Sequence, residues 1–328
     1  MVDYQDILRA YDVVTKYKNP TPLHYSGNLG RITGNKIFLK SENLQLTGSF
    51  KLGGAINVMI NLSEDDKKKG VVTCSAGNWA QAVAYAARFF GIRSVIVMSE
   101  HASKTKISAT KGYGAEVVIY GENSNDVIKR SMDIAYSEGL NYLSPFEDDY
   151  LIAGHGTIGL EILREKPDTQ IVFCPIGSGA LISGVALAIK EKNPKVKIIG
   201  VQPEKANAMW LSLQKNSIVE KEQVDTIADG LALKKPGEKP FNIVKKYVDE
   251  IVLVTENEIK KALIFILERA KLLVEPSGAA SVAAIMSGKV NIKNREVVSI
   301  LSGGNIDLDK LAVFLKLISG GSYVKGIS

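Results

Sequence analysis

The sequence predicts an α/β protein built from two open, mostly parallel twisted sheets with helices on both faces. Short runs rich in Val and Ile alternate with segments of helical period along almost the whole chain. Most of these runs are continuously apolar, which is typical of parallel strands buried on both faces. The chain of 328 residues also exceeds what one minimal core needs. Because so many strands would overfill one domain, we expect two sheets.

Each strand candidate is an apolar run followed by a polar or turn-favouring residue. In chain order the strands are expected at residues 36–40, 70–74, 94–98, 115–120, 170–174, 196–201, 251–254 and 296–301. Between them apolar residues recur every three or four positions, which indicates amphipathic helices. These helices are expected at residues 50–62, 78–90, 125–138, 150–164, 180–192, 256–273 and 277–286.

Two interruptions divide the chain. Thr47-Gly48-Ser49 supplies turn chemistry, and residues 143–149 contain Pro145 and three acidic residues. We predict that residues 1–48 and 144–328 form a larger domain and that residues 49–143 form a smaller, inserted α/β domain. The Gly- and Ser-containing tail from residue 319 onward is expected to be loosely held.

Composition narrows the chemistry. The chain has three His, two Cys and no Cys-x-x-Cys pair, so we expect no zinc or iron–sulfur site. The net charge of +6 comes from short Lys clusters interleaved with acids, which is typical of solvated helix ends and not of a nucleic-acid groove. The start resembles no signal peptide, and no apolar stretch is long enough to cross a membrane. We therefore expect a cytoplasmic protein without nucleic-acid or membrane partners.

Four loops share one place in the predicted fold, the end of a strand just before a helix, where open α/β sheets bind ligands. The first loop carries Lys51 in the first turn of a helix. The positive end of the helix dipole would lower the pKa of this amine and favour its neutral, nucleophilic form. Taken alone, Lys51 would be an ordinary exposed lysine.

The other three loops add polar groups. Ser75-Ala76-Gly77-Asn78 has the small residues of an anion-binding helix start, although plain capping explains it equally well. Gly177-Ser178-Gly179-Ala180 matches neither the Walker loop nor the Rossmann spacing, so it predicts a phosphate site of another kind. Ser302 ends a strand and would otherwise be a common turn residue. A nucleophilic lysine beside a phosphate site suggests pyridoxal 5'-phosphate, which binds lysine covalently and supplies an electron sink.

At these residues the chain resembles the fold type II pyridoxal phosphate enzymes, similar in fold to the tryptophan synthase β chain, and within them the threonine/serine dehydratase branch. The resemblance extends from Thr21 to Asn305. The strings that carry it, in order, are Leu39-Lys40-Ser41-Glu42-Asn43-Leu44-Gln45, Ser49-Phe50-Lys51, Ser75-Ala76-Gly77-Asn78, Gly156-Thr157-Ile158-Gly159, Ala228-Asp229-Gly230, Glu275-Pro276-Ser277-Gly278-Ala279 and Ser302-Gly303-Gly304-Asn305.

The resemblance implies a role for each matching position. Lys51 would be the Schiff-base lysine and Phe50 the aromatic residue beside the cofactor ring. Asn78 would contact the ring hydroxyl, and Ser302 the pyridine nitrogen. In the larger domain, Gly177, Ser178, Gly179, Ala180 and Leu181 would hold the cofactor phosphate. In the smaller domain, Ser75, Ala76 and Gly77 would bind the substrate carboxylate. Trp79, Gly230 and Glu275 are further candidates for the site.

The chain also departs from the family pattern. The family usually has Arg where Gly53 stands, His where Trp79 stands and Gln where His155 stands, and four Gly in the phosphate loop that here contains Ser178 and Ala180. Trp79 would either reshape the substrate pocket or pack in the core. The divalent-metal site of related enzymes would need carboxylates at positions 202 and 208, which are Gln202 and Ala208 here, so no metal is expected.

The resemblance implies dehydration and deamination of L-threonine and L-serine to 2-oxobutyrate or pyruvate plus ammonia, with Lys51 removing the α-proton, in a homodimer or homotetramer. The alternatives are threonine synthase, a cysteine-synthase-like β-replacement, hydroxyaspartate dehydratase, serine racemase, or a cofactor-binding protein with little activity. Racemisation is disfavoured because Ala76 stands where a racemase needs a proton-transferring Ser. No C-terminal regulatory domain is expected, and hence no isoleucine feedback through one.

Overall fold

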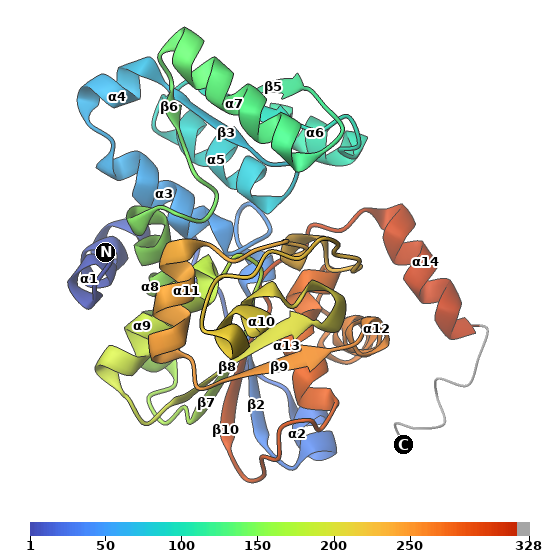
Figure 1. Cartoon of the computed structure of the whole chain (residues 1–328). Helices are drawn as coiled ribbons and strands as arrows, with labels where there is room; N and C mark the ends of the chain where they lie inside the picture. The colour runs from blue at the N-terminus through green and yellow to red at the C-terminus, as the bar shows by residue number, and fades with distance from the viewer. Residues whose placement is uncertain (320–328) are drawn as a thin grey trace.

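Two β-sheets organise the protein, as the computed structural model of residues 1–319 shows (Figure 1). The tail predicted to be loosely held lies, from residue 320 on, outside these described residues. The larger sheet has six strands in the order β1 (Leu23–Tyr25), β2 (Lys36–Lys40), β10 (Glu296–Ile300), β7 (Ile171–Pro175), β8 (Lys197–Pro203) and β9 (Glu250–Val254). Only the edge pair β1–β2 is antiparallel among these neighbours.

The smaller sheet has four parallel strands in the order β5 (Glu116–Ile119), β4 (Ser94–Met98), β3 (Val71–Cys74) and β6 (Asn141–Tyr142). The α-helices are α1 (Tyr4–Val14), α2 (Gly27–Thr33), α3 (Lys51–Asn61), α4 (Glu64–Lys69), α5 (Asn78–Phe89), α6 (Lys104–Gly112), α7 (Ser124–Glu138), α8 (Asp149–Glu165), α9 (Ala180–Lys192), α10 (Ala208–Lys215), α11 (Glu238–Tyr247), α12 (Glu256–Phe265), α13 (Pro276–Met286) and α14 (Leu308–Ser319).

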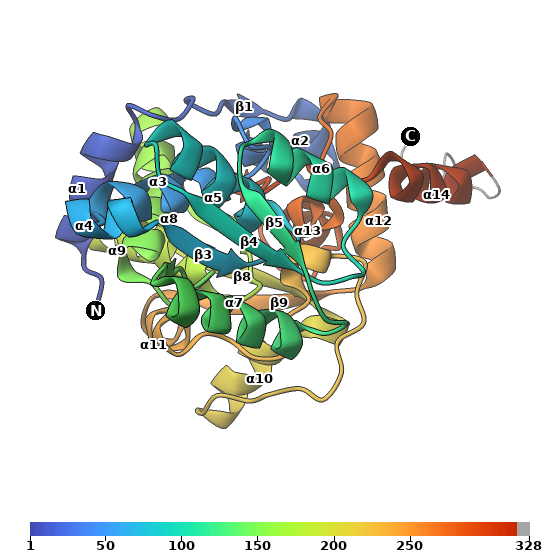
Figure 2. The same ribbon diagram turned by 90° about the horizontal axis from the view of Figure 1, so that it is seen from above.

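Helices cover both faces of each sheet, so the predicted fold class is confirmed (Figure 2). Successive residues of a strand point to opposite faces. In β7, Val172 packs with residues of α8 and α9, and Phe173 packs with residues of α12 and α13. In the smaller sheet, Val72 packs against α7 and Val71 lies in the core that contains α5. Burial on both faces explains why these strands are continuously apolar.

The structure adds elements to those expected and shortens one. Strands β1 and β6 have three and two residues, too short for a periodic signal. The helix expected at residues 256–273 ends at Phe265 and continues as a π-helical turn, Ile266–Ala270, before Lys271 adopts φ 59°. Ser49 has a side chain suited to capping a helix, but the N-cap residue of α3 is the next residue, Phe50. Boundary shifts of this size are usual at helix ends.

All four strands of the smaller sheet come from residues 71–142, and all six of the larger sheet come from outside this range. This distribution supports the predicted inserted domain of residues 49–143, whose boundaries remain a prediction. Within residues 1–319, no helix has both the length and the apolar character that crossing a bilayer requires.

Candidate active site

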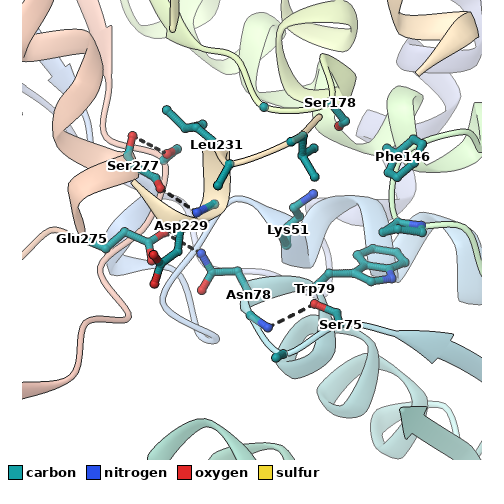
Figure 3. Close-up of a pocket in the computed structure, with 18 of the residues that line it drawn as sticks. Lys51, Ser75, Asn78, Trp79, Phe146, Ser178, Asp229, Leu231, Glu275 and Ser277 are labelled. Carbon is teal, nitrogen blue, oxygen red and sulfur yellow. Dashed lines mark hydrogen bonds between the residues drawn. The ribbon is translucent and has the colours of Figure 1, made fainter. Parts of the chain in front are cut away.

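A cavity of about 550 Å³ opens between the two sheets, at the carboxyl ends of β3, β7 and β10 (Figure 3). Its volume falls within the range of small-molecule sites. The structure brings every residue predicted for the site to the wall of this one cavity. They are Phe50, Lys51, Ser75, Ala76, Gly77, Asn78, Trp79, Gly177, Ser178, Gly179, Ala180, Leu181, Gly230, Glu275 and Ser302.

Lys51 is the first residue of α3. The segment before it is held against the end of β10, because Phe50 N–H donates to the Ser302 carbonyl at 3.0 Å and Ser49 forms a bridge with Gly303. The Lys51 amine has no hydrogen-bond or ion-pair partner among residues 1–319, and its Nζ lies 4.9 Å from the centre of the Phe50 ring. Burial lowers the pKa of Lys51 to about 8. Near neutral pH this amine is therefore partly unprotonated and nucleophilic.

The turn before α5 faces this amine. Gly77 N–H donates to the Ser75 hydroxyl oxygen at 3.1 Å, and Gly77 is the N-cap residue of α5. Asn78, the first residue of α5, donates from its side-chain amide to Glu275 Oε1 at 2.6 Å and accepts from Asn305 Nδ2 at 2.8 Å. The turn thus places backbone N–H groups and a fixed amide at a helix N-terminus, a suitable environment for a carboxylate.

The glycine-rich loop begins α9. Gly179, the N-cap residue, has φ 101°, which few residues other than glycine adopt. A Cβ at Gly179 would lie 2.6 Å from Met209 Cε, and one at Gly177 would lie 2.8 Å from the Gly230 carbonyl oxygen. Gly237 N–H donates to the Ser178 carbonyl at 3.1 Å and ties the loop to the segment before α11. Free N–H groups at this helix start suit a phosphate group.

Glu275 lies on the side of the cavity opposite Trp79 and Phe146 (Figure 3), and Ser302 also lines the cavity. Ser302 Oγ donates to the Ser277 carbonyl at 3.5 Å and is buried. Burial raises the pKa of the Glu275 carboxyl group to about 7, although the hydrogen bond from Asn78 favours its ionised form. A carboxyl group with such a shifted pKa inside a cavity is typical of a functional site.

An unpaired lysine amine, a glycine-rich helix start and a neutral hydroxyl around one cavity are the groups that the class of α/β enzymes with a phosphorylated, lysine-bound cofactor requires. The chain belongs to the family described as pyridoxal-phosphate dependent enzyme, whose model matches residues 14–303. Its cofactor is pyridoxal 5'-phosphate.

Three known proteins are similar to this chain. L-threonine ammonia-lyase of Thermotoga maritima is 46% identical over 95% of this chain and 77% of its own length. Catabolic L-threonine dehydratase of Escherichia coli is 46% identical over 95% of both chains. The structure of maize serine racemase superposes with a TM-score of 0.92, at 33% identity, over 97% of this chain and 98% of that chain.

The residues of the cavity fit pyridoxal 5'-phosphate. The unpartnered Lys51 amine meets the requirement for a group that binds an aldehyde. The loop at Gly177 and Gly179, where side chains would collide with the surrounding protein, leaves backbone N–H groups for the phosphate. Ser302 offers a hydroxyl and Asn78 an amide toward the same space. Each of these individual assignments remains a prediction.

Two departures from the family pattern, Gly53 and His155, have different surroundings. Gly53 is buried where α3 crosses α8, and a Cβ there would lie 3.0 Å from the Gly154 carbonyl. His155 is buried, edge-on to the Phe50 ring at 4.8 Å, with neither ring nitrogen hydrogen-bonded within the described residues. Burial, with the nearby Lys51 and Lys18 charges, lowers its pKa well below the usual value. His155 is therefore neutral in the folded protein.

Gln202, where related enzymes have a metal-binding carboxylate, serves a structural role. Its side chain donates to the Ala206 carbonyl at 3.2 Å and accepts from Trp210 N–H at 2.9 Å. The cavity also includes residues that we did not predict for the site, chiefly Phe146, Lys106 and Lys310. Phe146 follows Pro145 in a segment that the sequence indicates only as a domain boundary.

Proposed function

We propose that this protein is a pyridoxal phosphate-dependent L-threonine ammonia-lyase that converts L-threonine to 2-oxobutyrate and ammonia, and L-serine to pyruvate and ammonia. The observation that carries the proposal is the convergence of Lys51, the Ser75–Gly77 turn and the glycine-rich loop on one cavity. Two relatives named for this reaction, each matching 95% of this chain, support it.

The chain's own residues would supply binding and proton transfer. The Ser75–Gly77 turn would bind the substrate carboxylate and so place the α-carbon between this turn and Lys51. Lys51, with its lowered pKa, would then take the α-proton at Nζ. Pyridoxal phosphate supplies an electron sink for the α-carbon when bound. Ser302 is a neutral hydroxyl and need not keep the cofactor nitrogen protonated, an arrangement adequate for elimination.

The alternatives would use the same cavity differently. A racemase needs a second acid or base opposite Lys51, and Ala76 has no polar side-chain atom there. Threonine synthase and β-replacement enzymes need a phosphorylated substrate or a second nucleophile. The test is a substrate panel with the purified holoenzyme. Ammonia and 2-oxobutyrate from threonine alone would support the lyase, whereas turnover that requires phosphohomoserine or sulfide would contradict it.

We further propose a homodimer or homotetramer that works in the cytoplasm, since most oligomers of soluble proteins are closed, symmetric homo-oligomers. Sedimentation of the holoenzyme tests the assembly. The inserted domain at residues 49–143 is proposed on the strand distribution described above. Limited proteolysis that cuts near residues 44–49 and 143–149 would support these boundaries.

A further inference from the structure

The indole of Trp79 is fixed beside the substrate space. Its Nε1–H donates to Thr73 Oγ1 at 3.0 Å, and that hydroxyl donates in turn to the Leu143 carbonyl at 2.7 Å. Trp79 is 2% exposed, and Lys51 Nζ lies 5.9 Å from the centre of its ring. Two hydrogen bonds in series thus hold a large flat side chain within reach of the group that would act on the substrate.

The part of this indole that lines the cavity is carbon. Tryptophan has one hydrogen-bond donor and no acceptor, and here the donor is used by Thr73 inside the protein. Pro145 and Phe146 line the same cavity. Figure 3 shows Trp79 and Phe146 on one side of Lys51, and Asp229 and Glu275 on the other. We call Pro145, Phe146 and Trp79 the apolar wall.

A substrate held between the Ser75–Gly77 turn and Lys51 would lie beside this wall. Its carboxylate would bind the Ser75–Gly77 turn and its α-carbon would face Lys51, and Trp79 stands next to both in Figure 3. A methyl group on the β-carbon would gain apolar contact there. A carboxylate in its place would lose water without gaining a hydrogen bond or an opposite charge from the wall.

We propose that Trp79 and Phe146 form the subsite for the methyl group of threonine, so that the enzyme prefers threonine to serine and rejects 3-hydroxyaspartate. This inference rests on the proposed ammonia-lyase function and adds the substrate preference. One methyl group in an apolar pocket is worth roughly tenfold in kcat/KM, so we expect a threonine-to-serine ratio of about ten. Longer aliphatic chains such as that of 3-hydroxynorvaline would collide with the fixed indole.

The experiment compares kcat/KM for threonine, serine, 3-hydroxynorvaline and 3-hydroxyaspartate in the wild-type holoenzyme and four variants, Trp79→Ala, Trp79→Phe, Phe146→Ala and Trp210→Ala. Trp79→Ala removes the wall, whereas Trp79→Phe keeps an apolar ring but loses the bond to Thr73. Trp210→Ala removes the other tryptophan of the chain, which does not line the cavity, and serves as the matched control. Ratios between substrates on one preparation do not depend on the fraction of folded enzyme.

We expect Trp79→Ala to lower the threonine-to-serine ratio of kcat/KM to about one. The same variant should raise kcat/KM for 3-hydroxynorvaline, relative to that for threonine, roughly tenfold. Trp79→Phe and Trp210→Ala should keep ratios near the wild-type value, and Phe146→Ala should act like Trp79→Ala. An unchanged ratio in Trp79→Ala, a fall in Trp79→Phe as large as in Trp79→Ala, or ready wild-type turnover of 3-hydroxyaspartate would overturn the inference. Release of no ketoacid from threonine or serine by the wild type would instead overturn the proposed function.

Discussion

The Asn78 side-chain amide donates to Glu275 Oε1 at 2.6 Å, joining the start of α5 to the N-cap residue of α13. Asn305 donates to the other end of the same amide at 2.8 Å and also to the Thr47 carbonyl. Asn78 is therefore held from both sides, and groups from the two sheets meet at its amide. The buried Glu275 carboxyl group is the ionisable member of this contact.

Glu275→Gln should change how stability depends on pH. Burial raises the pKa of Glu275 to about 7, above its value of about 4.5 in the unfolded chain. The contribution of Glu275 to the free energy of unfolding is therefore fully present below about pH 4.5 and is lost as pH rises through 7. The loss amounts to on the order of 3 kcal/mol. Thermal unfolding of the apoenzyme between pH 4.5 and 8 measures it. The glutamine variant should show a flatter decline, whereas exposed Glu268→Gln should follow the wild type. Parallel curves for all three proteins would contradict the assignment.

Gly179→Ala should weaken cofactor binding by tenfold or more. Its φ of 101° is unfavourable for alanine, and the new Cβ would meet Met209 and Pro240. Gly288→Ala is the matched control because its φ of 70° is also positive but nothing lies within 4 Å of its Cβ. Both variants should lose roughly 1 to 2 kcal/mol of stability from the backbone alone. Titration of each variant with pyridoxal phosphate measures its affinity for the cofactor. Equal affinities in the two variants would refute the role of the glycine-rich loop in binding the phosphate.

A buried ion cluster supports the segment that leads to Lys51. Glu161 contacts Lys18 Nζ at 2.6 Å and Lys40 Nζ at 2.9 Å, and all three side chains are almost fully buried. Removing one partner leaves a buried charge uncompensated, so Glu161→Gln should cost about 3 to 5 kcal/mol in unfolding free energy. Glu64→Gln, in the exposed pair with Lys67, should leave the unfolding free energy almost unchanged because solvent screens that pair. Chemical denaturation measures both, and similar values would show that burial adds nothing here.

The lowered pKa of Lys51 predicts how quickly the apoenzyme captures its cofactor. Only the neutral amine attacks an aldehyde, so the rate should rise with pH and level off near pH 8. An ordinary lysine would keep gaining about tenfold per pH unit up to pH 10. Stopped-flow absorbance of apoenzyme mixed with pyridoxal phosphate follows this step. Continued acceleration between pH 8.5 and 10 would show that burial does not lower the pKa of this amine.

Much of the fold could be predicted because the strands are buried on both faces, and their sequences are therefore continuous apolar runs. The expected strand at residues 36–40 and the expected helix at 180–192 have the bounds of β2 and α9. Strands β1 and β6 could not be predicted, because two or three residues hold no period. The π-helical turn after Phe265 depends on packing, which the helical pattern does not record.

The residues of the site could be predicted from the sequence because most of them lie at the end of a strand or the start of a helix. Their mutual contacts could not. Nothing near Asn78 in the sequence indicates that Glu275 and Asn305 would hold its amide. The hydrogen bond from Trp79 Nε1–H to Thr73 likewise appears only in the three-dimensional structure. Because this bond uses the one donor of the indole, Trp79 presents only carbon atoms to a substrate.

The central claim is that Lys51 is the residue that carries the cofactor. Borohydride reduction of the holoenzyme followed by peptide mapping tests it directly, since reduction makes the bond between lysine and cofactor permanent. The label should appear on the peptide that contains Lys51, and Lys51→Ala should take up no label at this position and release no ketoacid. Stoichiometric label on any other lysine, with Lys51 unmodified, would contradict the account.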